Sequence, residues 1–268
     1  MEVTELPHSE NRLPLTATEF YERLTGVSIK NVAFSYGEGE SEAACASGDD
    51  ASTEAAEAFL EDNGVSLTCA DAFIPKGSFV VVEGPSGSGK STLFKLVLGA
   101  YDAEGFAYEL ARDGNAASCA ASQVPPGVFA YVPQDNFLFA GTVRENVAFA
   151  ASDTTDSQIE RACKAACAWS FVKELPLGLD TMIGEHGQGL SQGQLQRLAI
   201  ARAICSGAPI MVLDEVTSAL DDATEAAVLA SIAALPNKTV FVAAHRAKAR
   251  EFATMRLRVE NGVMNEMR

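Results

Sequence analysis

The residues best suited to chemistry lie in one glycine-rich stretch that runs from Gly84 to Thr92. A short apolar run, 79–82, precedes this stretch, and apolar residues with helical spacing follow it over 93–98. A strand, a glycine-rich loop and a helix in this order are typical of a phosphate-binding loop, because the glycines let several backbone N–H groups turn toward one anion. The positive end of the helix dipole adds to the attraction. The sequence therefore predicts that the chain binds a nucleoside triphosphate.

Two side chains of this stretch have specific expected tasks. Lys90 is expected to reach the β- and γ-phosphates, and the Ser91 hydroxyl is expected to ligate Mg²⁺. An ordinary glycine-rich turn between a strand and a helix is the alternative, and the complete GxxxxGKS spacing disfavours it. The residues expected to hold the nucleotide are Gly84, Pro85, Ser86, Gly87, Ser88, Gly89, Lys90, Ser91 and Thr92.

Two carboxylates follow a second apolar run, 210–213. A fully apolar run suits a central parallel strand that is covered on both faces, and open α/β sheets bind ligands beyond the carboxyl ends of such strands. Asp214 is expected to hold Mg²⁺ through its water shell, and Glu215 is expected to polarise the attacking water as general base. The alternative is a buried strand that ends in solvated acids, which is the weaker interpretation once the chain has a phosphate loop.

A third candidate site opens the predicted helix 191–205. Ser191 and Gln194 have the S-x-x-Q spacing of a capping box, in which each side chain binds the backbone N–H of the other residue. A capped helix N-terminus beside a glycine, here Gly193, can bind a second anion. Taken alone, this pattern indicates no more than a capped helix.

The elements that must position these residues follow an α/β order. Strand patterns cover 27–34, 65–74, 128–132, 210–213 and 239–244, and helical patterns cover 143–149, 156–168, 170–175, 191–205 and 223–235. The chain closes with a predicted hairpin that turns at Asn261 and Gly262, a pair typical of a type I′ turn. Residues 100–127 are alanine-rich and show no clear pattern.

The composition limits the class of protein. The 268 residues suit one large α/β domain, or one domain with a subdomain. A net charge of −16 disfavours a nucleic-acid-binding surface, because phosphate backbones require clustered Lys and Arg. No apolar run reaches the roughly 18 residues of a membrane span, and residues 1–24 lack the apolar core of a signal peptide.

Two segments are expected to lie outside the regular core. Residues 1–24 are expected to form a polar tail or linker with one short helix over 18–24. Residues 37–62 hold nine acidic residues and no Lys or Arg, which is typical of a solvated or disordered loop that contains at most a short helix.

The signature region makes a family resemblance specific. Residues 190–204 resemble the signature sequence of ATP-binding cassette (ABC) proteins, and the residues that carry it are Leu190, Ser191, Gln192, Gly193 and Gln194. Residues 84–92 resemble the Walker A motif of this family, and residues 210–215 resemble its Walker B motif. The family's D-loop is matched by Ser218, Ala219, Leu220 and Asp221. Gln134 matches the Q-loop glutamine, His245 the switch histidine, and Tyr36 the aromatic residue that stacks on adenine.

The resemblance begins near Gly26, covers nearly the whole chain, and implies a fold. It implies an α/β P-loop NTPase core, in which helices flank a mostly parallel sheet, with an antiparallel β subdomain and an inserted α-helical subdomain. The implied ABC ATP-binding domain covers 25–268, with the helical subdomain at about 135–195 and the acidic insert at about 37–62.

The resemblance also implies a mechanism. Two cassettes pair head to tail, so that the signature and D-loop residues of one complete the ATP site of the other. The implied catalytic residues are Lys90, Gln134, Glu215 and His245, and the implied Mg²⁺ ligands are Ser91, Gln134 and Asp214. ATP and Mg²⁺ are the implied cofactors.

Two further segments resemble those of exporter-type cassettes. Residues 137–147 and 180–187 match segments that meet the coupling helices of a membrane domain in the family. We therefore expect the ATPase subunit of an ABC exporter, held at the cytoplasmic face of the cell membrane by a separate transmembrane partner and binding no nucleic acid.

Two alternatives stay open. One is a soluble ABC-type ATPase without a transport role, and the other is a catalytically weak partner in a heterodimeric transporter. Gln192 stands where the family more often has glycine, which keeps the second alternative open. The insert 37–62 is longer than the family's usual loop, and residues 100–127 match the family's strand-rich arm poorly.

Overall fold

The structure is a computed structural model that describes residues 12–36, 66–112, 115–134, 138–151, 154–184, 189–244 and 247–267. The chain divides into two compact units, and each is described by itself. Unit 1 comprises Met1–Lys76, Gly84–Val128 and Arg258–Met267, and unit 2 comprises Gly77–Glu83, Phe129–Leu257 and Arg268. The expected acidic insert 37–62 lies outside the described residues.

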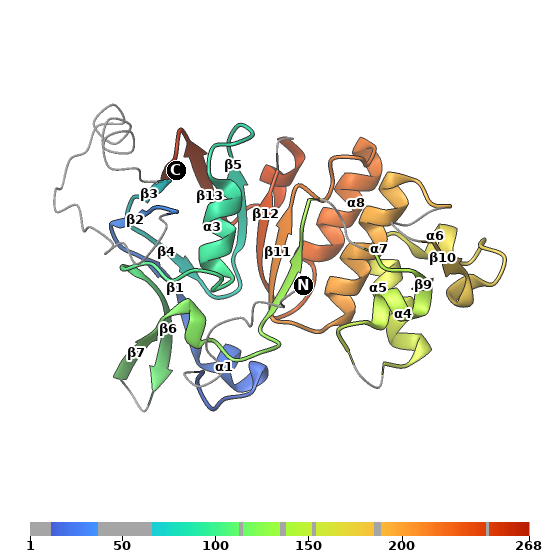
Figure 1. The fold of residues 1–268 in the computed structure, drawn as a ribbon, viewed down its shortest axis with the longest axis horizontal. Coiled ribbons are helices and arrows are strands. Elements are labelled where there is room, and N and C mark those ends of the chain that lie inside the picture. The colour runs from blue at the N-terminus through green and yellow to red at the C-terminus, as the bar shows by residue number, and fades with distance from the viewer. Residues whose placement is uncertain are drawn as a thin grey trace, which may run out of the picture. The chain divides into compact units, whose positions relative to one another are not determined.

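Unit 1 contains an antiparallel sheet with the strand order β4-β1-β6-β7. Its strands are β1 (Leu24–Ile29), β4 (Ala72–Pro75), β6 (Phe106–Arg112) and β7 (Asn115–Cys119) (Figure 1). The side chains of Phe106, Tyr108 and Leu110 alternate along β6 and are buried, as expected for a strand with one face on a core. This sheet confirms the antiparallel β subdomain that the resemblance implies.

The region 100–127 therefore is strand-rich, although its sequence pattern did not show it. Strands β6 and β7 form an antiparallel pair in which Tyr108 lies opposite Cys119, and a short 3₁₀ turn, η1 (Ala121–Gln123), follows. In β6, Ala107 and Ala111 add apolar residues on the face opposite the buried ones, and in β7 Ala116 and Ala117 lie on opposite faces. Apolar and polar positions therefore do not alternate clearly in the sequence.

One predicted strand, 27–34, is two strands that belong to different sheets. β1 ends at Ile29, and β2 (Val32–Phe34) pairs with β3 (Leu67–Cys69), which also pairs with β14 (Val263–Met267). Asn31 interrupts the run because its φ of +48° is left-handed, a conformation that asparagine tolerates better than most residues. The predicted strand 65–74 is likewise divided, into β3 and β4.

Two helices complete the described part of unit 1. Helix α1 (Ala17–Arg23) begins at a capping box between Thr16 and Glu19, and it buries Phe20 and Tyr21. The helix agrees with the short helix expected over 18–24. The ring of Phe20 packs edge-on against Tyr108 at 6.0 Å, so this helix is part of unit 1 and not of a tail. Helix α3 (Lys90–Val97) follows the glycine-rich loop directly.

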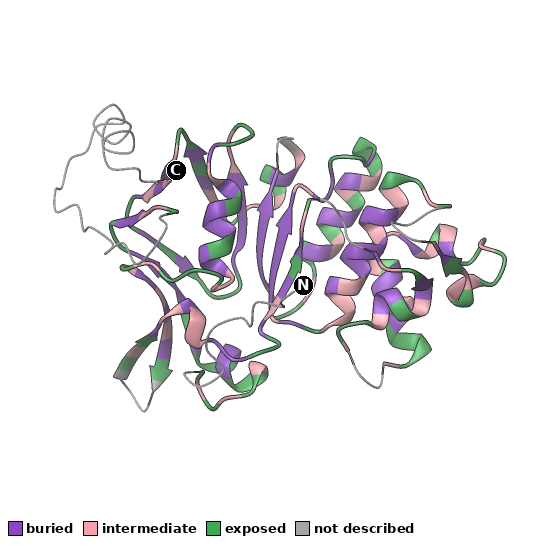
Figure 2. Ribbon diagram, in the orientation of Figure 1, coloured by how far each residue is buried: buried purple, intermediate pink, exposed green. Residues whose placement is uncertain are grey.

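Unit 2 contains four parallel strands in the order β5-β12-β11-β8. They are β5 (Phe79–Glu83), β8 (Phe129–Val132), β11 (Ile210–Asp214) and β12 (Thr239–Ala243). Val82 lies opposite Ala243, and Ala243 lies opposite Asp214, so the carboxyl ends of the three neighbouring strands reach one edge of the sheet. The apolar runs that predicted central parallel strands are buried over all five residues of β11 and β12 (Figure 2).

The remaining elements of unit 2 are mostly helical. They are β9 (Gly141–Thr142), α4 (Val143–Ala148), α5 (Asp156–Ala165), α6 (Trp169–Val172), η2 (Gly178–Asp180), β10 (Met182–Ile183), α7 (Gln192–Cys205), α8 (Asp222–Ala233) and η4 (Ala247–Phe252). One hydrophobic core joins the parallel strands to these helices, with Met211, Leu198 and Val228 among its buried residues. Within the ranges given above, none of the helices has the length and apolar character needed to span a bilayer.

The hairpin at the end of the chain has the predicted turn. Strand β13 (Met255–Glu260) is joined to β14 by Asn261 and Gly262, with φ of +48° and +75°. Two successive positive φ angles are what a type I′ turn requires.

Candidate nucleotide-binding site

The phosphate loop begins at the residue after β5 and is built by its backbone. Gly84 has a φ of +152°, and a Cβ atom there would lie 1.9 Å from the carbonyl oxygen of Val259. Gly89 has a φ of +108° and is the N-cap of α3, which receives no hydrogen bond from a capping side chain. Only glycine at position 84 lets the chain pass so close to Val259. Only glycine at position 89 lets α3 begin in this backbone conformation without a side chain beside the loop.

Two polar side chains of the loop indicate that it is an anion-binding site. Lys90 is buried, and its Nζ donates to the carbonyl oxygens of Gly84 and Pro85 at 2.9 and 2.8 Å, which holds the ammonium against the loop. The Oγ of Ser88 is buried and has no hydrogen-bond partner among the described residues. A buried hydroxyl rarely remains unpaired in a folded protein, so this loop fits a phosphate group as an additional partner.

Tyr36 lies against the same helix. Its hydroxyl donates to Thr92 Oγ1 at 3.0 Å, and its half-exposed ring packs against Phe34 and Tyr101 with centroid distances of 5.0 and 5.5 Å. The structure thus places the predicted adenine-stacking residue beside the phosphate-loop helix. Lys95 Nζ, 5.0 Å from the centroid of the Tyr36 ring, was not predicted from sequence.

In unit 2 the structure brings together the acids after β11 and the predicted Q-loop residue. Gln134 Nε2 donates to Glu215 Oε2 at 3.3 Å, and the Tyr131 hydroxyl lies 3.5 Å from Asp214 Oδ2. Asp214 is 5% exposed. Glu215 has a left-handed φ of +54°, a strained conformation for a glutamate and one that accumulates at functional sites.

These oxygen donors suit Mg²⁺. In the part of the chain that the structure describes, no group of three or more His, Cys, Asp or Glu side chains could hold a metal ion. Mg²⁺ usually takes one or two protein oxygens together with substrate phosphates and water, so the hydroxyl of Ser91, the amide oxygen of Gln134 and the carboxylate of Asp214 fit its chemistry. His245 lies outside the described residues.

Helix α7 begins at the predicted capping box. Ser191 N donates to Gln194 Oε1 at 2.8 Å, and Gln194 N donates to Ser191 Oγ at 3.3 Å. A Cβ at Gly193 would lie 3.1 Å from the carbonyl oxygen of Ala219, so glycine allows the D-loop to approach the helix closely. Asp221, the last D-loop residue, caps α8 by accepting from Ala223 N and Thr224 N. The signature and D-loop residues therefore lie side by side.

Two residues that sequence reasoning missed support this arrangement. Gln196, 1% exposed, donates from Nε2 to Ser218 Oγ and accepts from Ala219 N, both at 3.1 Å. Arg197 donates to the carbonyl oxygens of Gly193 and Cys167, and burial lowers the pKa of its guanidinium. The partners of Gln196 lie 22 and 23 residues away along the chain, so no local pattern could have indicated them.

A third unpredicted group surrounds the last residue of β5. Arg250 and Arg256 both donate from Nε and Nη2 to the carboxylate of Glu83, with distances between 2.8 and 3.4 Å. Burial opposes ionisation of Glu83, but the hydrogen bonds and charges of the two arginines outweigh it and lower the pKa of the carboxyl group. This fixes the strand end from which the phosphate loop departs.

Together these features define a P-loop nucleotide-binding domain. The glycine-built loop follows one parallel strand, and the acids and the glutamine follow two others of the same kind. A loop of this type after one parallel strand, with acids at the carboxyl end of another, is the arrangement used by nucleoside triphosphatases.

Comparison with known proteins narrows this class. The family described as ABC transporter matches residues 67–218, more than half of the chain, and the chain belongs to this family. A bacterial Atm1-family ABC exporter solved with ATP bound has a TM-score of 0.74 and 28% sequence identity, covering 98% of this chain and 41% of that exporter chain.

Sequence relatives agree with this family. The ATP-dependent lipid A-core flippase of Thiobacillus denitrificans is 44% identical over 191 residues, which are 70% of this chain and 33% of the flippase. The flippase of the same description from Haemophilus ducreyi is 41% identical over 253 residues, 93% of this chain and 39% of the flippase. The chain thus spans between a third and two fifths of the length of these relatives.

Proposed function

We propose that this chain binds and hydrolyses MgATP as the energy-supplying domain of a membrane exporter. The observation that carries the proposal is the hydrogen bond between Gln134 and Glu215. It joins the residue expected to ligate Mg²⁺ to the residue expected to activate water, in a chain that also has a complete phosphate loop. Glu215 is held in a strained backbone conformation at the end of a buried strand, as a positioned general base requires.

The residues divide the work on one nucleotide. The family resemblance assigns Ser91, Gln134 and Asp214 to a bound Mg²⁺, which together with Lys90 would offset the charge that develops on the β- and γ-phosphates. Glu215 orients the attacking water and accepts its proton, and Tyr36 stacks on the base. We assign His245 a contact with the γ-phosphate on the basis of the family resemblance.

The signature and D-loop residues act on the nucleotide of a second cassette. Ser191 and Gln192 are exposed at the start of α7, where N–H groups of the first turn can meet an anion from outside. In this arrangement ATP joins two cassettes head to tail, and hydrolysis removes the γ-phosphate that bridges them. We propose that the dimer then opens and moves a transmembrane partner.

A groove in unit 2 suits docking of that partner. It has a volume of about 260 Å³ and lies between β8 and the ends of α4 and α7. Phe149 is 69% exposed at its rim and packs against Phe139, and the guanidinium of Arg202 lies 5.7 Å from its ring. An exposed aromatic side chain over a structured groove is typical of a protein-binding site. We place the cytoplasmic side of the transmembrane partner here.

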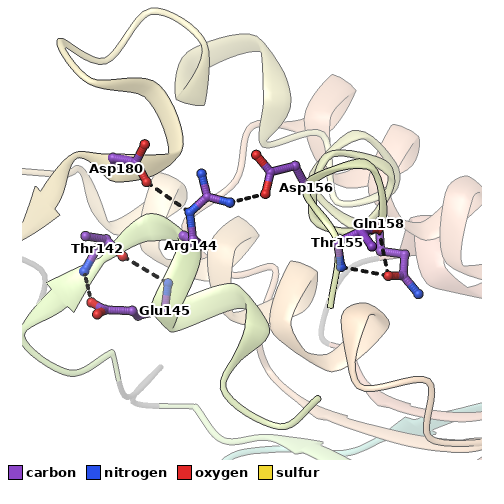
Figure 3. A network of polar contacts seen from close by, with 7 residues as sticks. All are labelled: Thr142, Arg144, Glu145, Thr155, Asp156, Gln158 and Asp180. Carbon is purple, nitrogen blue, oxygen red and sulfur yellow. Dashed lines mark hydrogen bonds and ion pairs between the residues drawn. The ribbon is translucent and has the colours of Figure 1, made fainter. Parts of the chain in front are cut away.

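The second exporter-like segment is tied to the first by polar contacts. Arg144, near the start of α4, binds Asp180 in η2 and Asp156 at the start of α5, as Figure 3 shows. Strands β9 and β10 pair beside this contact, with Thr142 opposite Met182. A strand pair and polar contacts therefore link residues 138–147 to residues 180–184, and we propose that the two segments together form the surface that receives force from the partner.

The experiment that tests the proposal replaces Glu215 with glutamine. We expect Glu215→Gln to slow ATP turnover by about 100-fold or more while MgATP binding persists, because the variant loses the general base and keeps the phosphate loop. With saturating ATP the variant should form a stable dimer, measured by light scattering. Glu160→Gln, which alters an exposed glutamate paired with Lys164, serves as control and should hydrolyse ATP at the normal rate. A Glu215→Gln variant that stays monomeric and hydrolyses ATP normally would show that the assignment is wrong.

A further inference from the structure

Three polar side chains form a chain of hydrogen bonds in unit 1. Lys95 Nζ donates to the Tyr36 hydroxyl oxygen at 3.4 Å, and the Tyr36 hydroxyl donates to Thr92 Oγ1 at 3.0 Å. Thr92 and Lys95 are three residues apart in α3 and therefore share one face of this helix. Thr92 itself belongs to the phosphate loop, so the chain ends at a hydroxyl of the nucleotide site.

The chemistry of the three groups sets the direction of the chain. An ammonium group can only donate, so the phenol oxygen of Tyr36 accepts from Lys95. A phenol O–H is a stronger hydrogen-bond donor than an aliphatic hydroxyl, so Tyr36 donates to Thr92. Thr92 then accepts at Oγ1, and its own proton is directed to a third group. Hydrogen bonds arranged in series polarise one another, which makes the last donor stronger.

The ring that carries the phenol is fixed by its neighbours. Phe34 and Tyr101 meet the Tyr36 ring nearly perpendicularly, at interplanar angles of 85° and 84°. Such edge-to-face pairs stabilise one ring orientation. Lys95 Nζ also lies 5.0 Å from the ring centroid, within the range of a cation–π contact. The hydroxyl of Tyr36 is therefore presented to Thr92 by a pre-organised cluster.

We propose that Tyr36 recognises the phosphate chain as well as the base of the nucleotide. Through its hydroxyl and Lys95 it directs the Thr92 hydroxyl proton to a phosphate oxygen. Tyr36 and Lys95 thereby act as positioning residues for Thr92. This inference rests on the proposed function, because it requires the phosphate loop to bind a nucleotide.

The test measures the affinity for MgADP, which is not hydrolysed, by titration calorimetry of the full chain. Tyr36→Phe keeps the ring and removes only the hydroxyl, and we expect it to weaken MgADP binding about fivefold, the effect of one hydrogen bond. Magnesium pyrophosphate, which has no base to stack, should lose affinity by a similar factor. A variant that weakens MgADP and leaves pyrophosphate binding unchanged would mean that the hydroxyl acts on the base, and the proposal would be wrong.

Coupling between the positions gives a second measurement. In a Thr92→Val background the Tyr36→Phe change should have no further effect, and Thr92→Ser, which keeps the hydroxyl, should bind nearly as wild type. Lys95→Met should weaken binding about twofold in the presence of Tyr36 and not at all in Tyr36→Phe. Lys164→Met removes an exposed lysine from α5 and is the matched control, with affinity unchanged.

Nucleotide binding by the chain and the role of Tyr36 in it can be refuted separately. If the wild-type chain binds neither MgADP nor pyrophosphate, the proposed function fails. If it binds both and Tyr36→Phe binds equally well, or if the Tyr36→Phe and Thr92→Val losses multiply independently, only the relay is refuted. If Thr92→Val does not fold, the effect of Lys95→Met with and without the Tyr36 hydroxyl still tests the relay.

Discussion

Two helices begin at sites that we propose to face nucleotide phosphates, and their first turns are built in opposite ways. Helix α3 begins at Gly89, in a left-handed conformation, and no side chain caps it. Helix α7 begins at Ser191, whose side chain closes a capping box with Gln194. A helix start without a capping side chain leaves its N–H groups to a ligand, whereas a capping box already satisfies part of them. The phosphate loop can therefore bind phosphate without help from a second cassette. The start of the signature helix is stabilised by its own side chains in the absence of a second cassette.

The starts of the two helices are also held in place differently, one by backbone approach and the other by side-chain contacts. Close backbone approach, such as that of Gly84 to the carbonyl group of Val259, shapes the phosphate loop. One buried and one half-buried side chain support the start of α7: Gln196 is bound to the D-loop, and Arg197 stacks over Phe171 at 4.8 Å. Substitutions in the phosphate loop should therefore cause a large loss of nucleotide affinity, and substitutions that remove a side-chain support of α7 should cause a smaller loss of activity.

The largest effect is expected from Gly84→Ala. The added Cβ would meet the Val259 carbonyl oxygen, a backbone atom that cannot rotate away, so the loop must change shape and MgADP affinity should fall by about 100-fold or more. Gly77→Ala is the matched control, because Gly77 also has a positive φ, +83°, but open space around a Cβ. The control should lose about 1 kcal/mol of stability and keep its affinity. A folded Gly84→Ala variant with normal affinity would contradict a backbone-built loop.

A smaller effect is expected from Gln196→Leu, which tests the side-chain-built region. Leucine fills similar space and leaves the Ser218 hydroxyl and Ala219 N–H without the partner they have now. The D-loop should shift relative to Gly193, and kcat for ATP should fall about tenfold with little change in KM, since the phosphate loop is untouched. Gln158→Leu, at the exposed cap of α5, is the control and should leave both constants unchanged. A rise in KM as large as the fall in kcat would contradict an effect confined to the D-loop. Because a partly unfolded sample also loses kcat at constant KM, urea unfolding of the same variant must show that it is folded.

The same contrast explains what could be predicted from sequence. The phosphate loop, the capping box and the acids after β11 are encoded in consecutive residues, and the described parts of all three have the expected structure. Gln196 and its D-loop partners are not consecutive, and Glu83 lies 167 residues from Arg250. Side-chain contacts of this range depend on how the chain folds back, which no local period records.

The strand errors have a related cause. The run 27–34 predicts one strand because Val27, Ile29, Val32 and Phe34 are all apolar, yet Asn31 turns the chain from one sheet to another. Apolar spacing shows which residues prefer burial, and it does not show in which sheet. In β6, alanines stand between the buried residues, and in β7 they lie on both faces. The alternation of apolar and polar residues is therefore weak, and the sequence pattern does not predict the strand-rich arm.

A third prediction concerns the end of β5 and pH. Glu83 has a pKa below its ordinary value of 4.5, so its contacts with Arg250 and Arg256 stabilise the folded chain above that pH and are lost as pH falls through the lowered value. Glu83→Gln should cost about 1–2 kcal/mol at pH 7 by urea unfolding, with the difference shrinking below about pH 4. A difference that does not depend on pH would mean that the carboxylate charge plays no part in holding this strand end.

The smallest effect is expected at Arg144, where the side-chain contacts are exposed. The carboxylates of its partners Asp156 and Asp180 are 70% and 65% exposed, so water and salt compete with both ion pairs. Arg144→Met should therefore destabilise the chain by only about 0.5 kcal/mol, and the loss should vanish in about 1 M salt, where charges are screened within roughly 3 Å. Lys164→Met, which breaks the exposed pair with Glu160, is the control and should show a similarly small, salt-sensitive loss. A loss above about 2 kcal/mol that persists in salt would show that Arg144 supports the helical block as Gln196 supports the signature helix. Burial would then not explain why the Gln196 contacts are expected to matter more than the Arg144 ion pairs.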